Sequence, residues 1–240
     1  MATPIKIPVI VETVIQHTDT VKTFLLRPLK KYPAFKPGQF LHLALDPYDP
    51  ASYWPESRVF SIASAPTRAP LRIVFAVKGP FTSRMFHEVK EGDELFVKLP
   101  YGSFTFLSDH PVVLIAGGTG VTPFLSFLEQ CLDKQAGTQI SLHYGVRTGA
   151  DLICGDLLRE CAKQLADFEY SCYVEDGSIV DGVGRCRQGI IPIEEIYAEN
   201  RAETASTYYL SGPLQMIRDF RSYLTAAGVA ESNIKVDDWE

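Results

Sequence analysis

The sequence predicts two domains of different fold class: a six-stranded antiparallel β-barrel over residues 1–107 and a doubly wound α/β parallel sheet over residues 108–240. In the first part, short apolar runs are separated by turn signals, and only one helical pattern interrupts them. In the second part, apolar runs alternate with amphipathic helical patterns, which is typical of a parallel sheet wound by helices. The pattern changes at "LSDHP", so we place the join near residues 107–110.

The first domain is expected to contain six strands, a number that suits a barrel or a sandwich. Turn signals such as Pro37-Gly38 and Gly92-Asp93 separate them. The expected strands cover residues 8–16, 21–29, 39–46, 58–64, 71–77 and 93–100.

One short helix is expected within the barrel domain, over residues 82–89. Thr82 or Ser83 is a suitable N-cap, because a hydroxyl can accept a hydrogen bond from the free amides of the first turn. The spacing of Met85, Phe86 and Val89 predicts the buried face of this helix.

The second domain opens with the fully apolar run 112–116, which predicts a buried parallel strand. A helix follows over residues 122–134, with Thr122 as N-cap and Pro123 at its first position. Its buried face is expected to consist of Phe124, Phe127, Leu128, Cys131 and Leu132. The later strands are expected at 140–146, 169–175, 207–212 and 233–239, and the later helices at 150–165, 193–199 and 213–228.

Composition and charge exclude several classes of function. A net charge of −6 disfavours nucleic-acid binding, although it does not exclude a local basic patch for an acidic partner. No apolar run reaches membrane-spanning length and no signal sequence begins the chain, so we expect a cytoplasmic protein. Histidines at scattered positions predict no metal site. The cysteines form no C-x-x-C pair and are expected to be buried thiols, with Cys154 and Cys161 on one helical face.

A glycine-rich loop between the first strand and first helix of the second domain predicts phosphate binding. The stretch "GGTGVTP", Gly117 to Pro123, has three glycines within four residues, more than a plain strand-to-helix turn requires. Glycines allow close backbone approach, and the following helix start offers free amides and a positive dipole end. The spacing differs from G-x-G-x-x-G. A later "LSGP", residues 210–213, also follows a strand and is either a second ligand loop or a turn.

Taken in order along the chain, these motifs resemble the ferredoxin–NADP reductase superfamily, specifically the flavin reductase modules of bacterial oxygenase systems. That family pairs a flavin-binding barrel with a nicotinamide-binding α/β domain. Its motif R-x-[YF]-S is similar to Arg58, Phe60 and Ser61, and its glycine-led second flavin segment is similar to "KGPFTSRMF". The motif G-G-T-G-x-x-P matches Gly117 to Pro123, and "YGVR", "SGP" and an acidic–x–aromatic ending, Asp237 to Trp239, follow in the family's order.

The resemblance implies a flavin site in the barrel. Arg58 would bind the diphosphate of FAD, Phe60 would lie against the isoalloxazine, and Ser61 would approach flavin N5. A bend after Phe60 is needed, because neighbouring strand residues point to opposite faces. The alternatives are a solvated arginine and a core phenylalanine. The implied flavin contacts are Arg58, Val59, Phe60, Ser61, Val77, Gly79, Thr82, Ser83 and Trp239.

The resemblance also implies a nicotinamide site in the second domain, near Thr119 and Ser211. Asp237 would lie near the reacting groups, and Trp239 would cover the flavin until nicotinamide displaces it. The alternatives are a solvated acid and an aromatic that patches the core. The implied nicotinamide contacts are Gly118, Thr119, Gly120, Val121, Arg147, Gly212 and Pro213, and the implied catalytic residues are Ser61, Ser211, Asp237 and Trp239.

Three positions depart from the commoner family residues. The family usually has Tyr at Phe60 and Cys at Ser211, and its ending is usually Glu and Phe where this chain has Asp237 and Trp239. The missing phenol removes one hydrogen bond to flavin. The hydroxyl at Ser211 replaces a thiol beside the transferred hydride, and function is expected to persist.

The function implied is hydride transfer from NAD(P)H to bound FAD, followed by electron transfer to a separate acceptor, a ferredoxin or oxygenase component. No plant-type iron–sulfur spacing occurs in the chain. The alternatives are a reductase of free flavin and a non-catalytic flavin-binding subunit. Arg147 is either a cofactor contact or a solvated strand-end arginine, and Asp151 and Asp156 near it favour NADH over NADPH.

Overall fold

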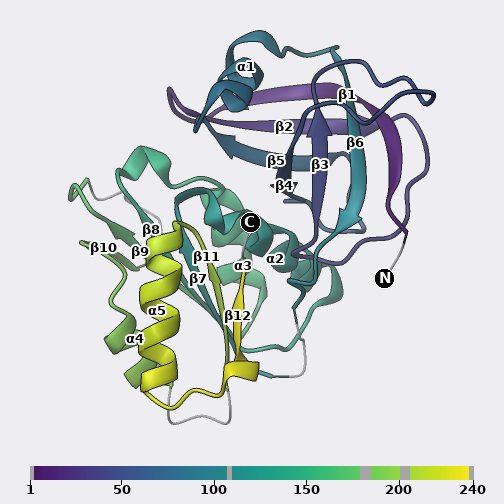
Figure 1. Cartoon of the computed structure of the whole chain (residues 1–240). Coiled ribbons are helices and arrows are strands. Elements are labelled where there is room, and N and C mark those ends of the chain that lie inside the picture. The colour runs from purple at the N-terminus through teal and green to yellow at the C-terminus, as the bar shows by residue number, and fades with distance from the viewer. Residues whose placement is uncertain (1–2, 107–109, 179–184, 201–205, 238–240) are drawn as a thin grey trace. The chain divides into compact units, whose positions relative to one another are not determined.

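The barrel half of the chain is one antiparallel sheet in the strand order β4-β3-β6-β1-β2-β5 (Figure 1). The computed structural model describes residues 3–106, 110–178, 185–200 and 206–237. All six predicted strands are confirmed. They are β1 (Ile5–Gln16), β2 (Val21–Pro28), β3 (Phe40–Ala44), β4 (Ser57–Ser61), β5 (Leu71–Ala76) and β6 (Glu94–Tyr101).

The two edge strands of this sheet, β4 and β5, are joined by the chain that leaves β4. The amide of Ala63 donates to the carbonyl of Arg72 at 2.7 Å, which nearly closes the sheet into a barrel. Every second residue of each strand points inward, and these inward-pointing residues form an apolar core. Phe24 and Phe75 illustrate this packing, with ring centroids 4.9 Å apart in an edge-to-face arrangement.

Helix α1 (Pro80–Glu88) begins two residues earlier than the sequence predicts. Gly79 is its N-cap, so the prediction of Thr82 or Ser83 as the cap is wrong. The hydroxyl of Thr82, at the third helical position, instead accepts hydrogen bonds from the amides of Lys78 at 2.8 Å and Gly79 at 3.1 Å. Met85 and Phe86 are buried as predicted.

The second half contains a parallel sheet in the order β10-β9-β8-β7-β11-β12, so the predicted two-part fold class is confirmed. Its strands are β7 (Val112–Gly117), β8 (Ile140–Val146), β9 (Phe168–Val174), β10 (Arg185–Gln188), β11 (Thr207–Ser211) and β12 (Ile234–Val236). The order reverses between β7 and β11. In open α/β sheets, ligands bind at the carboxyl ends of the strands at such a switch point.

The helical segments of the second half are η1 (Gly118–Val121), α2 (Thr122–Lys134), η2 (Gly149–Asp151), α3 (Gly155–Gln164), α4 (Ile193–Asn200), α5 (Leu214–Ala226) and η3 (Glu231–Asn233). Helix α2 has the predicted bounds, but Thr122 is its first residue and not its N-cap. The reason is that the 3₁₀ turn η1 runs directly into α2 through Val121, which is already helical.

The helix expected over 150–165 is divided into η2 and α3. Cys154 has φ +61°, a left-handed conformation that an α-helix does not accept, so α3 starts at Gly155. The shared helical face proposed for Cys154 and Cys161 is therefore wrong. All five cysteines are free thiols, and Cys131, Cys161 and Cys172 are buried.

Contacts within the chain divide the molecule into two units. The barrel unit comprises Met1–Thr105 together with Thr122–Gln130, and the sheet unit comprises Phe106–Val121 and Cys131–Glu240. The predicted join falls largely on residues 107–109, outside the described residues. Within the sheet unit, α4 and α5 pack on one face of the sheet through a common core (Figure 1).

Among the residues that the structure describes, no helix combines the length and the apolar character needed to cross a bilayer. Nor do the described histidines, cysteines and acidic residues form a group of three or more able to hold a metal ion.

Candidate functional site

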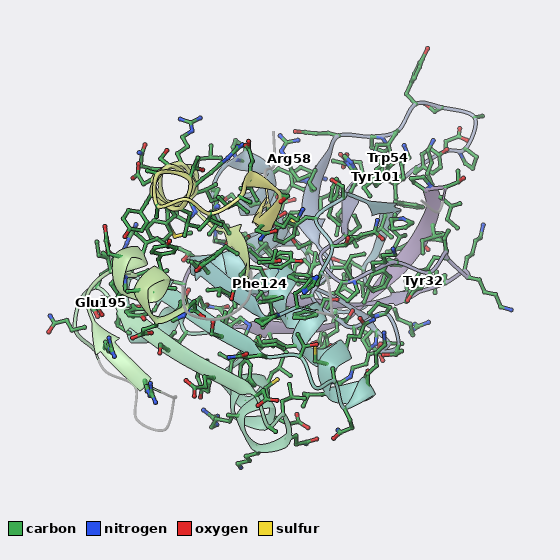
Figure 2. The ribbon with its side chains drawn as sticks, turned by 90° about the horizontal axis from the view of Figure 1, so that it is seen from below. Tyr32, Trp54, Arg58, Tyr101, Phe124 and Glu195 are labelled. Atoms are coloured by element: carbon green, nitrogen blue, oxygen red, sulfur yellow. The ribbon has the colours of Figure 1, made fainter. Side chains whose placement is uncertain are left out.

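Arg58 on β4 is partly exposed and lies beside the first turn of α1. The centre of its guanidinium is 5.0 Å from the ring centroid of Phe81. Its Nη2 donates to Oε1 of Glu56 at 2.7 Å, and its Nη1 donates to the carbonyl of Ser57 at 2.9 Å (labelled in Figure 2). The positive charge on this strand is thus balanced by Glu56, and the cation stands next to a helix N-terminus, where the backbone also favours anions.

The hydrogen bonds that cap the start of α1 are all made among residues 78–83. Gly79 is extended, with φ −179°, and the place that a Cβ would occupy there has no atom within 4 Å. The amide of Ser83 donates to the carbonyl of Gly79 at 2.9 Å, and the Thr82 hydroxyl is used by the cap. Pro80 has no amide hydrogen, and the Thr82 hydroxyl already serves the cap. An anion at this helix start would therefore bind to the other backbone amides of the first turn.

Phe60 and Ser61 are both buried, but they point to opposite faces of β4. The β3–β4 ladder is regular, with Leu41 opposite Phe60 and Phe40 opposite Ser61, so the expected bend after Phe60 is absent from it. The Phe60 ring belongs to the barrel core and meets the Phe75 ring edge-to-face, with centroids 6.2 Å apart. Phe60 thus packs as a core phenylalanine, the alternative to a flavin contact. Its contact with a flavin stays a prediction.

The other two apolar residues expected at this site have different settings. Val59 is half-buried and lies opposite His42 on β3. Val77 follows β5 and packs against the barrel core, and its amide donates to the carbonyl of Thr20 at 2.8 Å. The amide of Val77 is therefore already used within the barrel.

The end of β7 and the 3₁₀ turn η1 together form the β7 loop (Gly117–Val121), whose three glycines serve two different purposes. A Cβ on Gly120 would lie 2.4 Å from the carbonyl oxygen of Ser211, and one on Gly117 would lie 2.6 Å from Cδ of Pro213. These two glycines thus let the β7 loop touch residues 211–213 at the end of β11, the β11 loop, directly. Gly118 differs, because it has φ +55° and open space where a Cβ would stand. Gly118 is the member of the loop that leaves its backbone accessible.

The remaining residues of the β7 loop contribute unequally. Thr119 is half-buried, whereas the side chain of Val121 is fully buried, so only the backbone of Val121 is available to a ligand. On the neighbouring loop, Gly212 has φ +151° and Pro213 is exposed at the N-cap of α5. Together these residues form the carboxyl-end edge of the sheet at the switch point between β7 and β11.

Ser211 and Asp237 meet at this edge. The Ser211 hydroxyl donates to Oδ2 of Asp237 at 2.9 Å, and the Asp237 amide donates to the carbonyl of Leu210 at 2.9 Å. The two side chains are 2% and 4% exposed. The alternative of a solvated acid at Asp237 is therefore wrong. Trp239, predicted to cover the flavin, lies outside the described residues.

Of the charged side chains that follow β8, Arg159 and Asp156 pair with each other and Asp151 has a local partner. Arg147 is exposed at the strand end. Arg159 donates to Oδ1 of Asp156 at 2.5 Å, and Asp151 accepts from the amide and hydroxyl of Thr148. Arg147 is therefore available to a ligand at this strand end. Arg159 could bind such a ligand only by giving up its contact with Asp156.

One buried acid, Glu129 on α2, was not predicted from the sequence. Glu129 interrupts the apolar pattern of α2, yet it is 5% exposed and contacts the segment that follows β4. The available signal was its position between Leu128 and Cys131, which were both predicted to be buried. A charge at that place requires a partner from elsewhere in the fold.

Comparison with known proteins gives one family match and several relatives. Residues 114–222 match the family model of the oxidoreductase NAD-binding domain. The chain is 31% identical over 214 residues to the reductase component of propane 2-monooxygenase from Mycolicibacterium goodii, covering 85% of this chain and 59% of that relative. It thus spans less than two thirds of the length of that relative.

The fold is also similar to solved structures over nearly the whole chain. The structure of the cytochrome P450 reductase GcoB from Amycolatopsis matches with a TM-score of 0.82 and 21% identity, over 98% of this chain and 70% of that chain. A ferredoxin NADP⁺ reductase from Neisseria gonorrhoeae, with bound FAD and NADP, matches with a TM-score of 0.75 and 21% identity, over 98% of each chain. A barrel followed by a wound sheet is therefore the arrangement shared by all three chains.

Proposed function

Because the chain belongs to the ferredoxin–NADP reductase superfamily, we propose that it is an NAD(P)H-dependent flavoprotein oxidoreductase. It takes a hydride from the nicotinamide onto bound FAD and passes the two electrons on to a separate acceptor. The isoalloxazine supplies the redox chemistry, and the chain supplies binding and orientation. The observation that carries the proposal is the position of Arg58 beside the start of α1, which suits the diphosphate of a dinucleotide flavin.

The flavin half of the site is assigned to β4 and α1. Arg58 would exchange its contacts with Glu56 and with the Ser57 carbonyl for the diphosphate, and the planar guanidinium would then offer two parallel donors to phosphate oxygens. First-turn amides of α1 add donors to the same anion. The open space at Gly79 lets a phosphate approach the helix start without meeting a side chain. The residues present therefore fit a diphosphate.

The nicotinamide half is assigned to the β7 and β11 loops. Gly118 exposes the backbone that receives the phosphates of the dinucleotide. Since the Ser211 hydroxyl donates its hydrogen bond to Asp237, its oxygen is left as an acceptor. An acceptor in this place suits the N–H groups of the nicotinamide carboxamide, so Asp237 orients Ser211 and Ser211 orients the ring.

Charge favours NADH over NADPH. A 2′-phosphate requires a group of free cations near the end of the second strand of the domain. Arg159 is committed to Asp156 at 2.5 Å, and Asp151 adds another negative charge beside Arg147. Arg147, with Asp151 and Asp156 near it in the sequence, is a weak site for a 2′-phosphate. This supports NADH, which lacks that phosphate.

The proposed acceptor is a separate redox protein, a ferredoxin or an oxygenase component. The relative from Mycolicibacterium goodii is the reductase component of a monooxygenase, which supports this class of partner. We place the reaction in the cytoplasm, where NADH is available.

Anaerobic stopped-flow mixing of the purified, FAD-loaded protein with NADH and with NADPH tests the proposal. We expect the flavin absorbance to bleach with both nucleotides and faster with NADH. Gel filtration beforehand shows whether the flavin stays bound, which distinguishes a flavoprotein from a reductase of free flavin. Absence of bleaching with either nucleotide would overturn the enzyme function.

A further inference from the structure

Glu129 on α2 is a buried carboxylate that the proposed reaction does not yet use. It stands on a helix whose neighbouring residues from Val121 to Leu128 are all buried, and only 5% of it is exposed. A charged side chain in such a place is costly unless it is paired and hydrogen-bonded. The surroundings of Glu129 meet both conditions.

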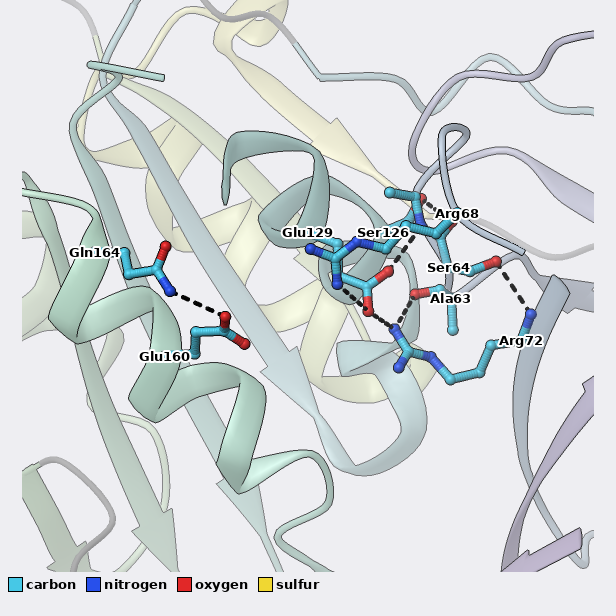
Figure 3. A network of polar contacts seen from close by, with 9 residues as sticks. Ala63, Ser64, Arg68, Arg72, Ser126, Glu129, Glu160 and Gln164 are labelled. Atoms are coloured by element: carbon cyan, nitrogen blue, oxygen red, sulfur yellow. Dashed lines mark hydrogen bonds and ion pairs between the residues drawn. The ribbon is translucent and has the colours of Figure 1, made fainter. Parts of the chain in front are cut away.

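Three donors surround the Glu129 carboxylate (Figure 3). The backbone amide of Ala65 donates to Oε2 at 2.8 Å. Nη2 of Arg72, on β5, donates to Oε1 at 2.5 Å, and Nη1 of Arg68 lies 3.3 Å from the same oxygen. One carboxylate thus joins α2, β5 and the segment that links β4 to β5, all within the barrel unit.

The segment of residues 62–65 is held by further contacts to the same two elements. The Ser126 hydroxyl of α2 donates to the carbonyl of Ser64 at 2.7 Å. Arg72 donates through Nη2 to the carbonyl of Ala63 at 2.9 Å and through its amide to the hydroxyl of Ser64 at 3.1 Å. Because Ile62, Ala63, Ser64 and Ala65 are almost fully buried, these contacts fix one backbone path.

This path begins where β4 ends, at Ser61. Three residues separate Ser61 from Ala65, the residue whose amide Glu129 holds. A displacement at Ala65 is therefore passed on to Ser61 through a short, buried stretch of backbone. An apolar residue at position 129 would pack against the same neighbours without the desolvation cost, so packing alone does not account for the charge.

We propose that Glu129 is a positioning residue for the flavin site: through Ala65 and Arg72 it fixes the segment after β4 and thereby the place of Ser61 against the flavin ring. The proposal rests on the proposed function, since it assigns Glu129 to the same site. Glu129 itself contacts no cofactor. Its effect is on the geometry of the residues that do.

The Glu129→Gln variant tests this, with Glu160→Gln as the matched control. Glu160 is an exposed glutamate on α3 that accepts from Gln164 at 3.0 Å (Figure 3). In Glu129→Gln we expect faster hydrogen exchange at residues 62–68 without added flavin, and a shifted visible spectrum of the bound FAD. Flavin reduction by NADH at saturating FAD should slow by about tenfold to a hundredfold, the usual effect of displacing reacting groups by about 1 Å. Glu160→Gln should match the wild type in all three readouts.

A double variant separates positioning from stability. Glu129→Gln leaves Arg72, whose side chain is 20% exposed, without its charged partner, so the thermal midpoint falls. In Glu129→Gln/Arg72→Met the carboxylate and its closer arginine are both gone, while Arg68 keeps its charge, and we expect the thermal midpoint to recover in part while the FAD spectrum and the reduction rate stay altered. If the spectrum and rate recover together with the midpoint, or never change in Glu129→Gln, the positioning role is overturned.

The wild type distinguishes this inference from the proposed function. A wild-type protein whose FAD is bleached by NADH, beside a Glu129→Gln variant with the same spectrum and rate, overturns the role of Glu129 alone. A wild-type protein that binds no FAD or is not reduced by either nucleotide overturns the proposed function itself.

Discussion

The Ser211 hydroxyl donates a hydrogen bond of 2.9 Å to Oδ2 of Asp237, although 26 positions separate the two residues in the sequence. Ser211 is the last residue of β11, and Asp237 directly follows β12, the adjacent parallel strand. Strand ends of a parallel pair meet at the same edge of the sheet, so the pairing of these strands brings the hydroxyl and the carboxylate together. The contact lies at the carboxyl-end edge where the nicotinamide is proposed to bind.

Replacing Ser211 by Ala should weaken the sheet unit and the proposed nicotinamide site. The buried Asp237 carboxylate would lose a donor, and a hydrogen bond to a charged group contributes about 2 kcal/mol to the free energy of unfolding. We expect a loss of that size in urea titration, together with slower flavin reduction by NADH and unchanged FAD affinity. Ser211→Cys, which keeps a weak donor, should fall between Ala and the wild type. Equal stability of Ser211→Ala and the wild type would contradict the contact.

Arg58→Ala should weaken FAD binding without unfolding the barrel, because the side chain is half exposed and its ion pair is with Glu56, which is itself exposed. Losing one charge-assisted pair to phosphate, about 2 kcal/mol, corresponds to a rise of roughly thirtyfold in the FAD dissociation constant. Fluorescence titration of the apoprotein with FAD measures it.

Glu56→Gln is the control for this prediction. It removes the carboxylate that competes with phosphate for Arg58, so FAD affinity should hold or increase. A Glu56→Gln variant that loses FAD to the same extent as Arg58→Ala would assign the effect to the ion pair and not to phosphate binding.

The strands and most helices could be predicted from the sequence because their signals are local. The bounds of α2 and β8 coincide with the predicted residues, since each is a continuous periodic or apolar run. β10 was missed because its residues, "RCRQ", are polar and largely exposed, and only its pairing with β9 makes it a strand. The division of the helix at Cys154 was missed because the left-handed residue is a cysteine, whereas the glycine beside it, Gly155, is the first residue of α3.

The site was predictable as two sets of residues, and its contacts were not. The resemblance to known motifs suggested Ser211 and Asp237 separately, but their hydrogen bond depends on which strands are neighbours in the sheet. The roles of Gly117 and Gly120 depend likewise on the approach of the β11 loop. The partners of Glu129 come from β5 and the preceding segment, about 60 residues earlier in the chain, and no local pattern announces them.

Alanine at Gly120 should lower the free energy of unfolding more than alanine at Gly118 does. In Gly120→Ala, the new Cβ would lie 2.4 Å from a backbone oxygen, so the loops must separate, and we expect a loss of about 3 kcal/mol in the free energy of unfolding. In Gly118→Ala nothing crowds the Cβ, and only the left-handed backbone costs about 1 kcal/mol. Thermal or urea unfolding of both variants measures the difference.

Flavin reduction by NADH, by contrast, should be most sensitive to substitution of Gly118. Gly118→Val places a branched side chain where the dinucleotide phosphates are proposed to lie, so FAD binding should remain and reduction by NADH should be lost. Normal turnover in Gly118→Val would show that the phosphate loop is assigned to the wrong residue.

His143 should make the sheet unit sensitive to acid. It lies on β8 opposite Ile115, on the sheet face that α4 and α5 cover, and only 6% of it is exposed. Nδ1 shares a hydrogen bond of 3.2 Å with the Tyr173 hydroxyl, and Nε2 is buried with no hydrogen-bond partner among the described residues. Burial, and secondly the positive charge of Arg187, lower the pKa of His143 from 6.5 to about 4.

The folded protein therefore holds His143 neutral, whereas the unfolded chain protonates it near pH 6.5. Above pH 6.5 neither state carries the proton, and the stability that depends on neutral His143 is fully present. As the pH falls from 6.5 to about 4 the unfolded state binds more protons, so the free energy of unfolding declines by about 3 kcal/mol, and below pH 4 this contribution is lost. His143→Phe keeps an aromatic ring against Tyr173 but cannot be protonated. The difference between wild type and His143→Phe in urea titrations from pH 7 to pH 4 isolates this term from the carboxylates. Parallel pH profiles of the two proteins would mean that His143 does not titrate between these limits.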